Sequence, residues 1–256
     1  MTLVLAAHGT RRASGVAMIG DLATRVSELM SRPVRVAFVD VLGPTPSEVL
    51  GELATHHPGP AVVVPAFLSR GYHVRTDLPE HIAVSGHPDV TVTPALGPSS
   101  DIARILHQQL VQFGWQPGDS VILAAAGTSD PLARNDLHTT AELLSALTGT
   151  PVALGFAATG SPSVRQAVAA ARRHGTHRVV VASYLLADGL FQQRLHTSGA
   201  DLVTEPLGTH PGLPQLIANR FRRAAAHRST ARRPVRRPNC VEHNGLLHWR
   251  APTSGA

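Results

Sequence analysis

The sequence of 256 residues contains no lysine. This absence excludes a phosphate-binding loop that ends in lysine, a Schiff-base lysine and a lysine general base. Cysteine is almost as scarce, because Cys240 is the only one in the chain. A single cysteine excludes a framework of intramolecular disulfides and is typical of a reducing compartment, so we expect a cytoplasmic protein.

Long apolar runs are missing as well. No stretch approaches the roughly 20 apolar residues that are needed to span a bilayer. The start of the chain lacks the basic region and apolar stretch of a signal peptide. Aromatic residues make up only 4% of the chain, and no nucleic-acid-binding motif is recognisable. We therefore expect neither a membrane nor a nucleic acid as partner.

The formal net charge of +6 is distributed unevenly. From Asn219 onward the chain has nine arginines and one acid, Glu242, whereas the remainder has 14 arginines and 16 acids. The body of the protein is therefore nearly neutral. We expect residues 227–256 to form a basic, flexible tail, and the rival interpretation is a tail that binds nucleic acid or an acidic surface.

Short apolar segments alternate with amphipathic segments along the first half of the chain. Four segments have the composition of buried strands: 3–7, 34–41, 61–68 and 90–94. Three other segments repeat apolar residues at helical spacing: 16–30, 44–56 and 102–110. Continuous apolar strands that alternate with helices predict an α/β fold, in which helices cover both faces of a parallel sheet.

The second half of the chain repeats this plan. Five residues recur with the same identity 118 positions later: Leu5, Gly9, Thr10, Phe38 and Gly71. In the third strand we expect one slip of the alignment, which places Phe67 opposite Tyr184. The constant offset predicts two copies of one α/β unit, residues 1–115 and 119–226. The alternative is that unrelated α/β units merely look alike.

Three polar residues of the first half lie where predicted strands end. His8 follows the first strand, Asp40 lies near the end of the second, and His73 lies just beyond the third. Because ligands bind at the carboxyl ends of parallel strands, we expect these three residues at one site. Two imidazoles and a carboxylate suit a divalent transition metal such as Fe²⁺, Co²⁺ or Ni²⁺, and imidazoles also accept protons near neutral pH.

All three polar residues are absent from the second copy. At the offset of 118, their counterparts are Ala126, Ala158 and Phe191. A scaffold role should have been needed in both copies, so the joint absence predicts a site in the first half alone. Taken singly, each residue also has an ordinary interpretation as a loop residue, a turn cap or a surface residue.

Four arginines flank the three polar residues in the sequence: Arg11, Arg12, Arg70 and Arg75. Guanidinium groups bind carboxylates through two hydrogen bonds, so four of them predict an acidic substrate with several carboxylates. The alternative is that they are surface residues of an arginine-rich chain. Gly9 and Gly71 would let a flat ligand approach the backbone closely.

The motifs HGTRR, AFVD and PAFLSRGYHVRTDLP, which follow or end the first three strands, resemble the sirohydrochlorin chelatase family. This class II group inserts Co²⁺ or Fe²⁺ into sirohydrochlorin. The resemblance covers about residues 2–226 and implies two tandem chelatase-like domains with a cleft between them. It implies that His8 and His73 bind the metal and accept protons, whereas the family often has glutamate at the position of Asp40.

The resemblance also implies the substrates and partners. The metal ion is a substrate, so no cofactor is permanently bound, and sirohydrochlorin is the acidic tetrapyrrole. The implied substrate-binding residues are Arg11, Arg12, Ser69, Arg70, Gly71, Tyr72 and Arg75. An upstream methyltransferase or dehydrogenase is a candidate partner.

Two points stay open at this stage. The metal is iron, for siroheme, or cobalt, for cobalamin, and we favour iron. The rival function is a tetrapyrrole or metal carrier that does not catalyse insertion. In the predicted tail, Cys240, His243 and His248 form an incomplete set of metal ligands.

Overall fold

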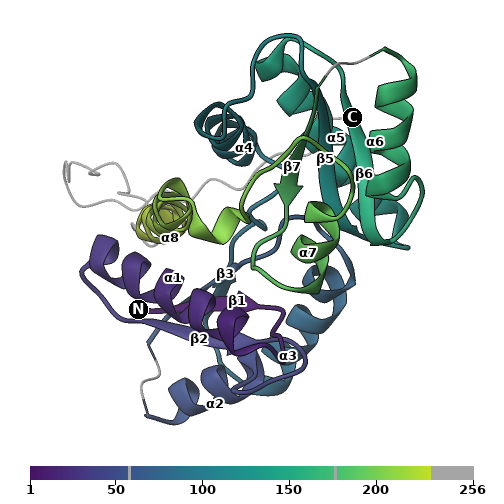
Figure 1. Cartoon of the computed structure of the whole chain (residues 1–256). Helices are drawn as coiled ribbons and strands as arrows, with labels where there is room; N and C mark the ends of the chain where they lie inside the picture. Colours follow the sequence, from purple (N-terminus) through teal and green to yellow (C-terminus); the bar gives the residue numbers. More distant parts are fainter. Residues whose placement is uncertain (57–58, 176–177, 232–256) are drawn as a thin grey trace, which may run out of the picture.

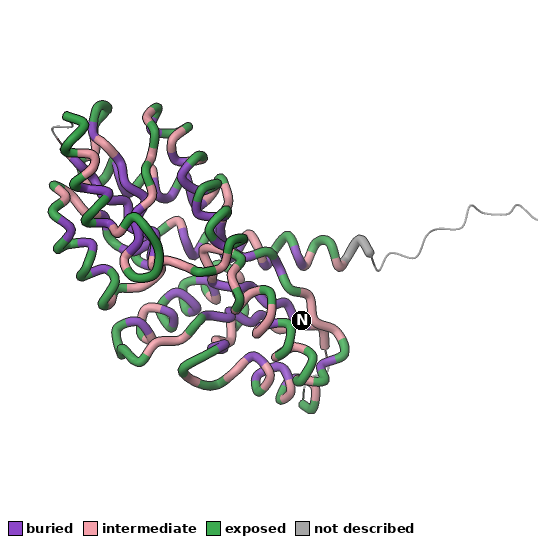
Figure 2. The backbone as a smooth tube through the Cα atoms, turned by 90° about the vertical axis from the view of Figure 1, so that its right-hand side faces the viewer, coloured by how far each residue is buried: buried purple, intermediate pink, exposed green. Residues whose placement is uncertain are grey.

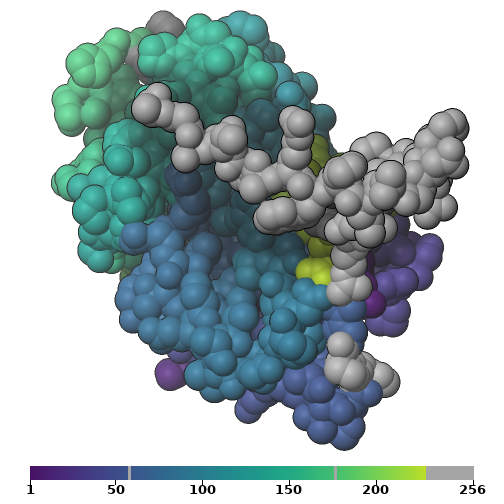
Figure 3. Space-filling view, turned by 180° about the vertical axis from the view of Figure 1, so that it is seen from behind, coloured from purple at the N-terminus to yellow at the C-terminus, as the bar shows by residue number. Residues whose placement is uncertain are grey.

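The chain folds into two α/β lobes, one from each half of the sequence (Figure 1). The computed structural model describes residues 1–56, 59–175 and 178–231. Seen from behind, the first half forms the lower body of the molecule and the second half the upper body (Figure 3). None of the described helices combines the length and the apolar composition that a membrane span requires.

The first half builds a parallel sheet in the order β2-β1-β3-β4. Its strands are β1 (Thr2–Ala7), β2 (Val34–Phe38), β3 (Ala61–Pro65) and β4 (Val90–Val92). Its helices are α1 (Ala13–Met30), α2 (Pro46–His56), the π-helical turn η1 (His73–Asp77), α3 (Leu78–Ser85) and α4 (Ser100–Gln112).

The second half builds a parallel sheet in the equivalent order, β6-β5-β7-β8. Its strands are β5 (Ser120–Gly127), β6 (Val152–Thr159), β7 (Val179–Tyr184) and β8 (Leu202–Val203). Its helices are α5 (Pro131–Thr148), α6 (Val164–Arg173), α7 (Leu190–His196), the 3-10 turn η2 (Leu207–Thr209) and α8 (Gly212–Ala231). The predicted α/β fold with two tandem parallel sheets is confirmed.

The offset of 118 residues continues into the strand register. Thr2 pairs with Ala61 in the first sheet, and their counterparts at this offset, Ser120 and Val179, pair in the second. Helices α1 and α5 also begin and end 118 residues apart. The two halves are therefore true copies of one unit.

The slip predicted in the third strand is wrong. Tyr184 pairs with Ala125 on β5, and in the first half the Ala66 N–H donates to the carbonyl of Ala6, at the equivalent place. Tyr184 therefore corresponds to Ala66, and Phe67 lies one position further on. Phe67 and Tyr184 are separated by one residue less than the offset, so an alignment of the two aromatic residues suggests a slip that the strand pairing does not contain.

Three strands also end earlier than predicted, and the fourth strand of the sequence is one of them, because it ends at Val92. The second strand stops at Phe38, although backbone hydrogen bonds to the first strand continue as far as Asp40, and the chain then turns at Val41, which has a positive φ of 71°. The third strand stops at Pro65. The earlier end of the second strand places Asp40 in a loop at the carboxyl edge of the sheet, and the earlier end of the third strand does the same for Phe67.

Alternate residues of the central strands face two separate cores. In β1, Leu3 and Leu5 face a large core that both halves share, whereas Val4 and Ala6 face a smaller core under α2 and α3. This alternation follows from the two-residue period of a strand. Buried segments run through the centre of both lobes, and exposed residues line the outside (Figure 2).

The last helix of each half packs on the other half. Helix α4 of the first half packs against α5 and β7, and helix α8 of the second half packs against α1 and β3 (Figure 1). Phe221 of α8 is fully buried in the shared core. Residues 227–231, which the sequence assigns to the tail, belong to α8. The rest of the predicted tail, with Cys240, His243 and His248, lies outside the described residues.

Candidate functional site

The three polar residues singled out in the sequence come together at one edge of the first sheet. His8, Asp40 and His73 each offer a ligand atom, and these atoms all lie within 4.8 Å of one another. The residues follow β1, β2 and β3, which are neighbours in the order β2-β1-β3. Parallel strands present their carboxyl ends at the same edge, so the topology itself produces this cluster.

The two histidines are orientated by their Nδ1 atoms. The ring of His8 lies edge-to-face against that of His73, with the centroids 4.4 Å apart. The His73 Nδ1 is 2.5 Å from an oxygen of Asp77, and the His8 Nδ1 is 3.1 Å from the carbonyl oxygen of Gly9. Because both partners are acceptors, we assign the proton to Nδ1 in each ring. Both Nε2 atoms then keep a free lone pair.

Gly9 holds His8 close to the loop after β2. Its φ of 92° lies in the region that favours glycine, and a Cβ there would clash with the carbonyl oxygen of Asp40. The strand pairing continues through this point, because the Asp40 N–H donates to the carbonyl of His8 at 3.2 Å. The close approach of the two backbones therefore fixes the spacing between the imidazole and the carboxylate.

The second half builds the same turn without the polar groups. Gly127 has a φ of 111°, and a Cβ there would clash with the carbonyl oxygen of Thr159. Ala126 takes the place of His8. The backbone of this edge therefore forms without an imidazole, and His8 is not required by the fold.

One predicted correspondence needs a correction at this edge. Counting by 118 pairs Asp40 with Ala158, but Gly127 approaches Thr159 instead. The cause is a register irregularity between Ala125 and Gly127, which adds one residue to the second copy. Neither Ala158 nor Thr159 carries a carboxylate, so the absence of the acid from the second copy stands.

A cleft of about 860 Å³ lies between the two lobes and has the two histidines of the cluster, His8 and His73, on its wall. The first half contributes His8, His73 and Tyr72, and the second half contributes apolar residues, such as Phe191, together with the acids Asp130 and Asp188. From the sequence-predicted set, the cleft wall includes Arg11, Arg12, Ser69, Gly71 and Tyr72. The volume is that of a site for a large organic ligand.

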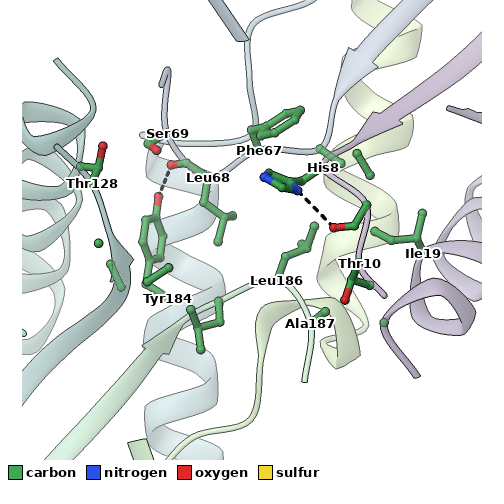
Figure 4. A pocket seen from close by; sticks show the side chains of 18 of the residues that line it. His8, Thr10, Ile19, Phe67, Leu68, Ser69, Thr128, Tyr184, Leu186 and Ala187 are labelled. Atoms are coloured by element: carbon green, nitrogen blue, oxygen red, sulfur yellow. Dashed lines mark hydrogen bonds between the residues drawn. The ribbon is translucent and has the colours of Figure 1, made fainter. Parts of the chain in front are cut away.

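A smaller cavity of about 250 Å³ adjoins the cleft beside His8 (Figure 4). Figure 4 shows the His8 ring next to Phe67, with Leu186 and Ala187 of the second half across the cavity. The lining is mainly apolar, so the imidazole faces an environment with few competing hydrogen-bond partners. Such surroundings strengthen electrostatic interactions with a bound ion.

The four predicted arginines divide into two groups. Arg11 and Arg12 are exposed on the cleft wall, and neither forms an ion pair within the part of the chain that the structure describes. Arg70 and Arg75 lie outside the cleft wall and bond to Asp136 and Asp130 of the second half. The structure therefore offers the first group to a ligand and engages the second between the lobes.

Sequence reasoning missed the acids that hold the first-half residues. Asp77 was detectable, because its spacing of four from His73 is typical of a side-chain pair on a helix. Asp136 was not, because it lies 66 residues from Arg70 and has no motif of its own. The hydrogen bonds from Arg70 to Asp136 raise the pKa of Arg70 further above its ordinary range.

The family follows from the sequence as a whole. The sequence model of the CbiX family matches residues 2–113 and again residues 120–224. The chain belongs to the CbiX family. The two CbiX matches coincide with the two copies seen in the fold, and the boundary between them falls in the connection from α4 to β5.

Individual CbiX-like proteins resemble this chain over different lengths. A sirohydrochlorin ferrochelatase of Priestia megaterium is 24% identical over 231 residues, which cover 84% of this chain and 87% of that protein. A sirohydrochlorin cobaltochelatase of Methanothermobacter thermautotrophicus is 31% identical over 77 residues, which cover 30% of this chain and 54% of that protein.

A solved structure supports the CbiX fold. The structure of SirB from Bacillus subtilis with Fe³⁺ is similar to this chain with a TM-score of 0.76 and 20% sequence identity. The alignment covers 90% of this chain and 98% of SirB. At this identity, the likeness concerns the arrangement of the two lobes.

Proposed function

We propose that this CbiX-family protein is a sirohydrochlorin chelatase, which inserts a divalent metal ion into sirohydrochlorin. One observation carries the proposal: ligand atoms of His8, Asp40 and His73 lie within 4.8 Å of one another. His8 and His73 lie on the wall of a cleft large enough for a tetrapyrrole, and Asp40 lies within 4.8 Å of them. Metal and macrocycle can therefore meet at these three side chains.

The reaction exchanges two protons for one metal ion. The divalent ion replaces the two pyrrole N–H protons, so the complex forms as two protons leave. The free Nε2 lone pairs of His8 and His73 are suited to hold the incoming ion and to accept these protons in turn. The hydrogen bond from His73 to Asp77 keeps that ring orientated during the exchange.

Asp40 supplies the negative charge of the cluster. One of its oxygens accepts a hydrogen bond of 2.7 Å from the backbone N–H of Val41, which orientates the carboxylate. The other oxygen has room for the ion or for a proton. We assign Asp40 the role of assisting the two histidines, because its charge lowers the repulsion between an imidazolium and a divalent cation.

The remaining cleft residues would hold the macrocycle. Arg11 and Arg12 are available to bind its carboxylates through charge-assisted hydrogen bonds. Tyr72 is 60% exposed and offers an aromatic face to a flat ligand. Ser69 and Gly71 complete this part of the wall, where a small side chain leaves room for the ring.

Iron is the metal that we propose, and siroheme the product. The ferrochelatase relative aligns with 84% of this chain, whereas the cobaltochelatase relative aligns with 30%. Both Fe²⁺ and Co²⁺ suit a site of two imidazoles and one carboxylate. The choice between them is therefore decided by measurement of both ions with the same protein.

The test is an insertion assay under anaerobic conditions. Purified protein is mixed with sirohydrochlorin and with Fe²⁺, Co²⁺ or Ni²⁺ in turn, and the absorbance change of the macrocycle is followed against a buffer control. We expect insertion well above the uncatalysed rate, fastest with Fe²⁺. Rates equal to the buffer control for every ion would refute the chelatase.

The same experiment separates the chelatase from a carrier. A carrier would bind sirohydrochlorin, which a fluorescence or absorbance titration detects, but it would not accelerate insertion at substoichiometric concentration. A chelatase gives many products per protein molecule. Multiple turnovers therefore exclude the carrier, and tight binding without turnover supports it.

A further inference from the structure

The loop that carries His73 is attached to the second half of the protein at three points. This loop, residues 68–77, follows β3 and ends in the turn η1. Its anchors in the second half are Tyr184, Asp136 and Asp130. None of them touches His73 itself.

The first anchor is a buried hydroxyl. The Tyr184 hydroxyl donates a hydrogen bond of 2.6 Å to the carbonyl of Leu68, and Thr140 lies within 3.2 Å of the same hydroxyl (Figure 4). The Tyr184 side chain is only 3% exposed, and its burial raises its pKa well above the ordinary value. The hydroxyl therefore stays protonated at neutral pH and can donate this hydrogen bond.

The second anchor is a buried carboxylate. Asp136 is 1% exposed and accepts hydrogen bonds from the backbone N–H of Arg70 at 2.7 Å and from its guanidinium at 2.5 to 3.2 Å. It fixes both the backbone and the side chain of Arg70. The Arg70 side chain is itself 62% exposed, so the pair joins a surface arginine of the loop to a buried carboxylate, which would be costly to leave without its cation.

The third anchor holds Arg75, which follows His73 by two residues in the loop. The Arg75 guanidinium bonds to a carboxylate oxygen of Asp130, and its Nε donates to the carbonyl of Arg70 at 3.1 Å. The other oxygen of Asp130 caps helix α5 by accepting from the Leu132 N–H. His73 therefore lies between two arginines that are each held by the second half.

We propose that Asp136 and Asp130 are positioning residues, which set the place of His73 relative to His8 through Arg70 and Arg75. This proposal rests on the proposed chelatase function. The second half then does more than close the cleft, because it fixes one metal-binding histidine of the first half. Misplacement of a reacting group by about 1 Å is enough to lower a rate by about 100-fold.

The test replaces each anchor by its uncharged isostere. Asp136→Asn and Asp130→Asn remove the ion pairs, and asparagine at 130 still caps α5. We expect Asp136→Asn to lower kcat by about 10- to 100-fold and Asp130→Asn by about 10-fold, as for partners of metal ligands. KM for sirohydrochlorin should change by less than about threefold, because Arg11 and Arg12 are untouched.

A readout on the metal alone separates positioning from mere stability. Co²⁺ is titrated into each variant and its ligand-field absorbance is recorded, with thermal unfolding measured in parallel. We expect both variants to bind Co²⁺ at least about 10-fold more weakly and with an altered spectrum. Arg75→Met should weaken binding as Asp130→Asn does, and the double variant should be no worse.

Asp119→Asn is the matched control. Asp119 is also buried, at 8% exposed, and pairs with Arg178 at 3.4 Å. It lies just before the amino end of its strand, β5, whereas the site lies beyond the carboxyl end of the equivalent strand, β1. The Asp119→Asn variant should be less stable than the wild type but should keep the wild-type Co²⁺ spectrum and kcat.

The positioning role would be overturned if Asp136→Asn and Asp130→Asn kept the Co²⁺ affinity, the Co²⁺ spectrum and the kcat of the wild type. If Asp136→Asn fails to fold, Asp130→Asn decides. If the wild type inserts no metal, the chelatase fails, and the Co²⁺ titration still tests the positioning of His73.

Discussion

The two halves of this protein share a backbone and differ in chemistry. Their sheets have equivalent orders, and two pairs of strands in each sheet keep the same register. At one edge, His8 and His73 stand in the first half where Ala126 and Phe191 stand in the second. Because the second copy folds with alanine at this turn, the turn does not require the imidazole of His8.

The comparison also shows how one position can serve both halves. Arg12 and Asp130 lie 118 residues apart and occupy the N-cap positions of α1 and α5. Both residues line the cleft, but Asp130 also caps its helix and binds Arg75. The copies have thus diverged by exchanging a cation for an anion at equivalent places, and the anion now supports the other half.

The largest effect is expected from the histidines. His8→Ala and His73→Ala should each lower kcat for insertion by about 100- to 10,000-fold, because proton acceptance and metal binding are both lost. Ala126→His, which adds an imidazole at the equivalent turn, should leave the rate within about twofold, since the second copy has no other ligand there. Steady-state insertion rates measure all three. Near-normal rates in both alanine variants would contradict the assigned site.

A smaller effect is expected from the paired glycines. Gly9→Ala and Gly127→Ala should each destabilise the fold by about 1 to 3 kcal/mol, because both glycines have positive φ and meet a carbonyl oxygen. Urea unfolding measures this change. Only Gly9→Ala should also lower kcat, by about 10-fold or more, because it separates His8 from Asp40. Equal losses of kcat in the two variants would show that the halves are not functionally distinct.

The smallest effect is expected from the exposed arginines. Arg11→Ala and Arg12→Ala should each raise KM for sirohydrochlorin by about 5- to 20-fold with little change in kcat, because a charge-assisted hydrogen bond is lost. Added salt should reduce the difference from the wild type. Arg165→Ala, an exposed arginine that bonds to the Thr197 carbonyl, serves as control. A KM unchanged in both cleft variants would remove these arginines from the binding site.

The sequence was sufficient for the repeated architecture. The identities at Leu5, Gly9 and Phe38 and their counterparts reflect backbone requirements that both copies share, so the offset predicted the fold. The cluster of His8, Asp40 and His73 was predictable for a related reason. Parallel strands place their carboxyl ends together, and the order of neighbouring strands then brings the three residues into contact.

The contacts between the halves were not predictable from the sequence. Arg70 was predicted to bind a ligand because it lies close to His73 in the sequence, but its partner Asp136 is 66 residues away. The placement of α4 and α8 on opposite halves was hidden for the same reason, since a helix pattern shows an apolar face but not the sheet that covers it. The predicted slip at Phe67 was wrong because the two aromatic side chains were taken to mark equivalent positions of the strands, whereas the backbone pairing makes Ala66 equivalent to Tyr184.

The reciprocal placement of α4 and α8 has a consequence for how the protein responds to dilution. Two separate chains that exchanged their last helices would come apart as their concentration fell. Here the partners are joined by the short connection between α4 and β5, so each meets the other at an effective concentration in the millimolar range. The two halves therefore stay together at any protein concentration. Because each half has its own stretch of sequence, a substitution in one half is not repeated in the other. That independence allows one copy to carry the two histidines and Asp40 while the other anchors the loop that holds His73.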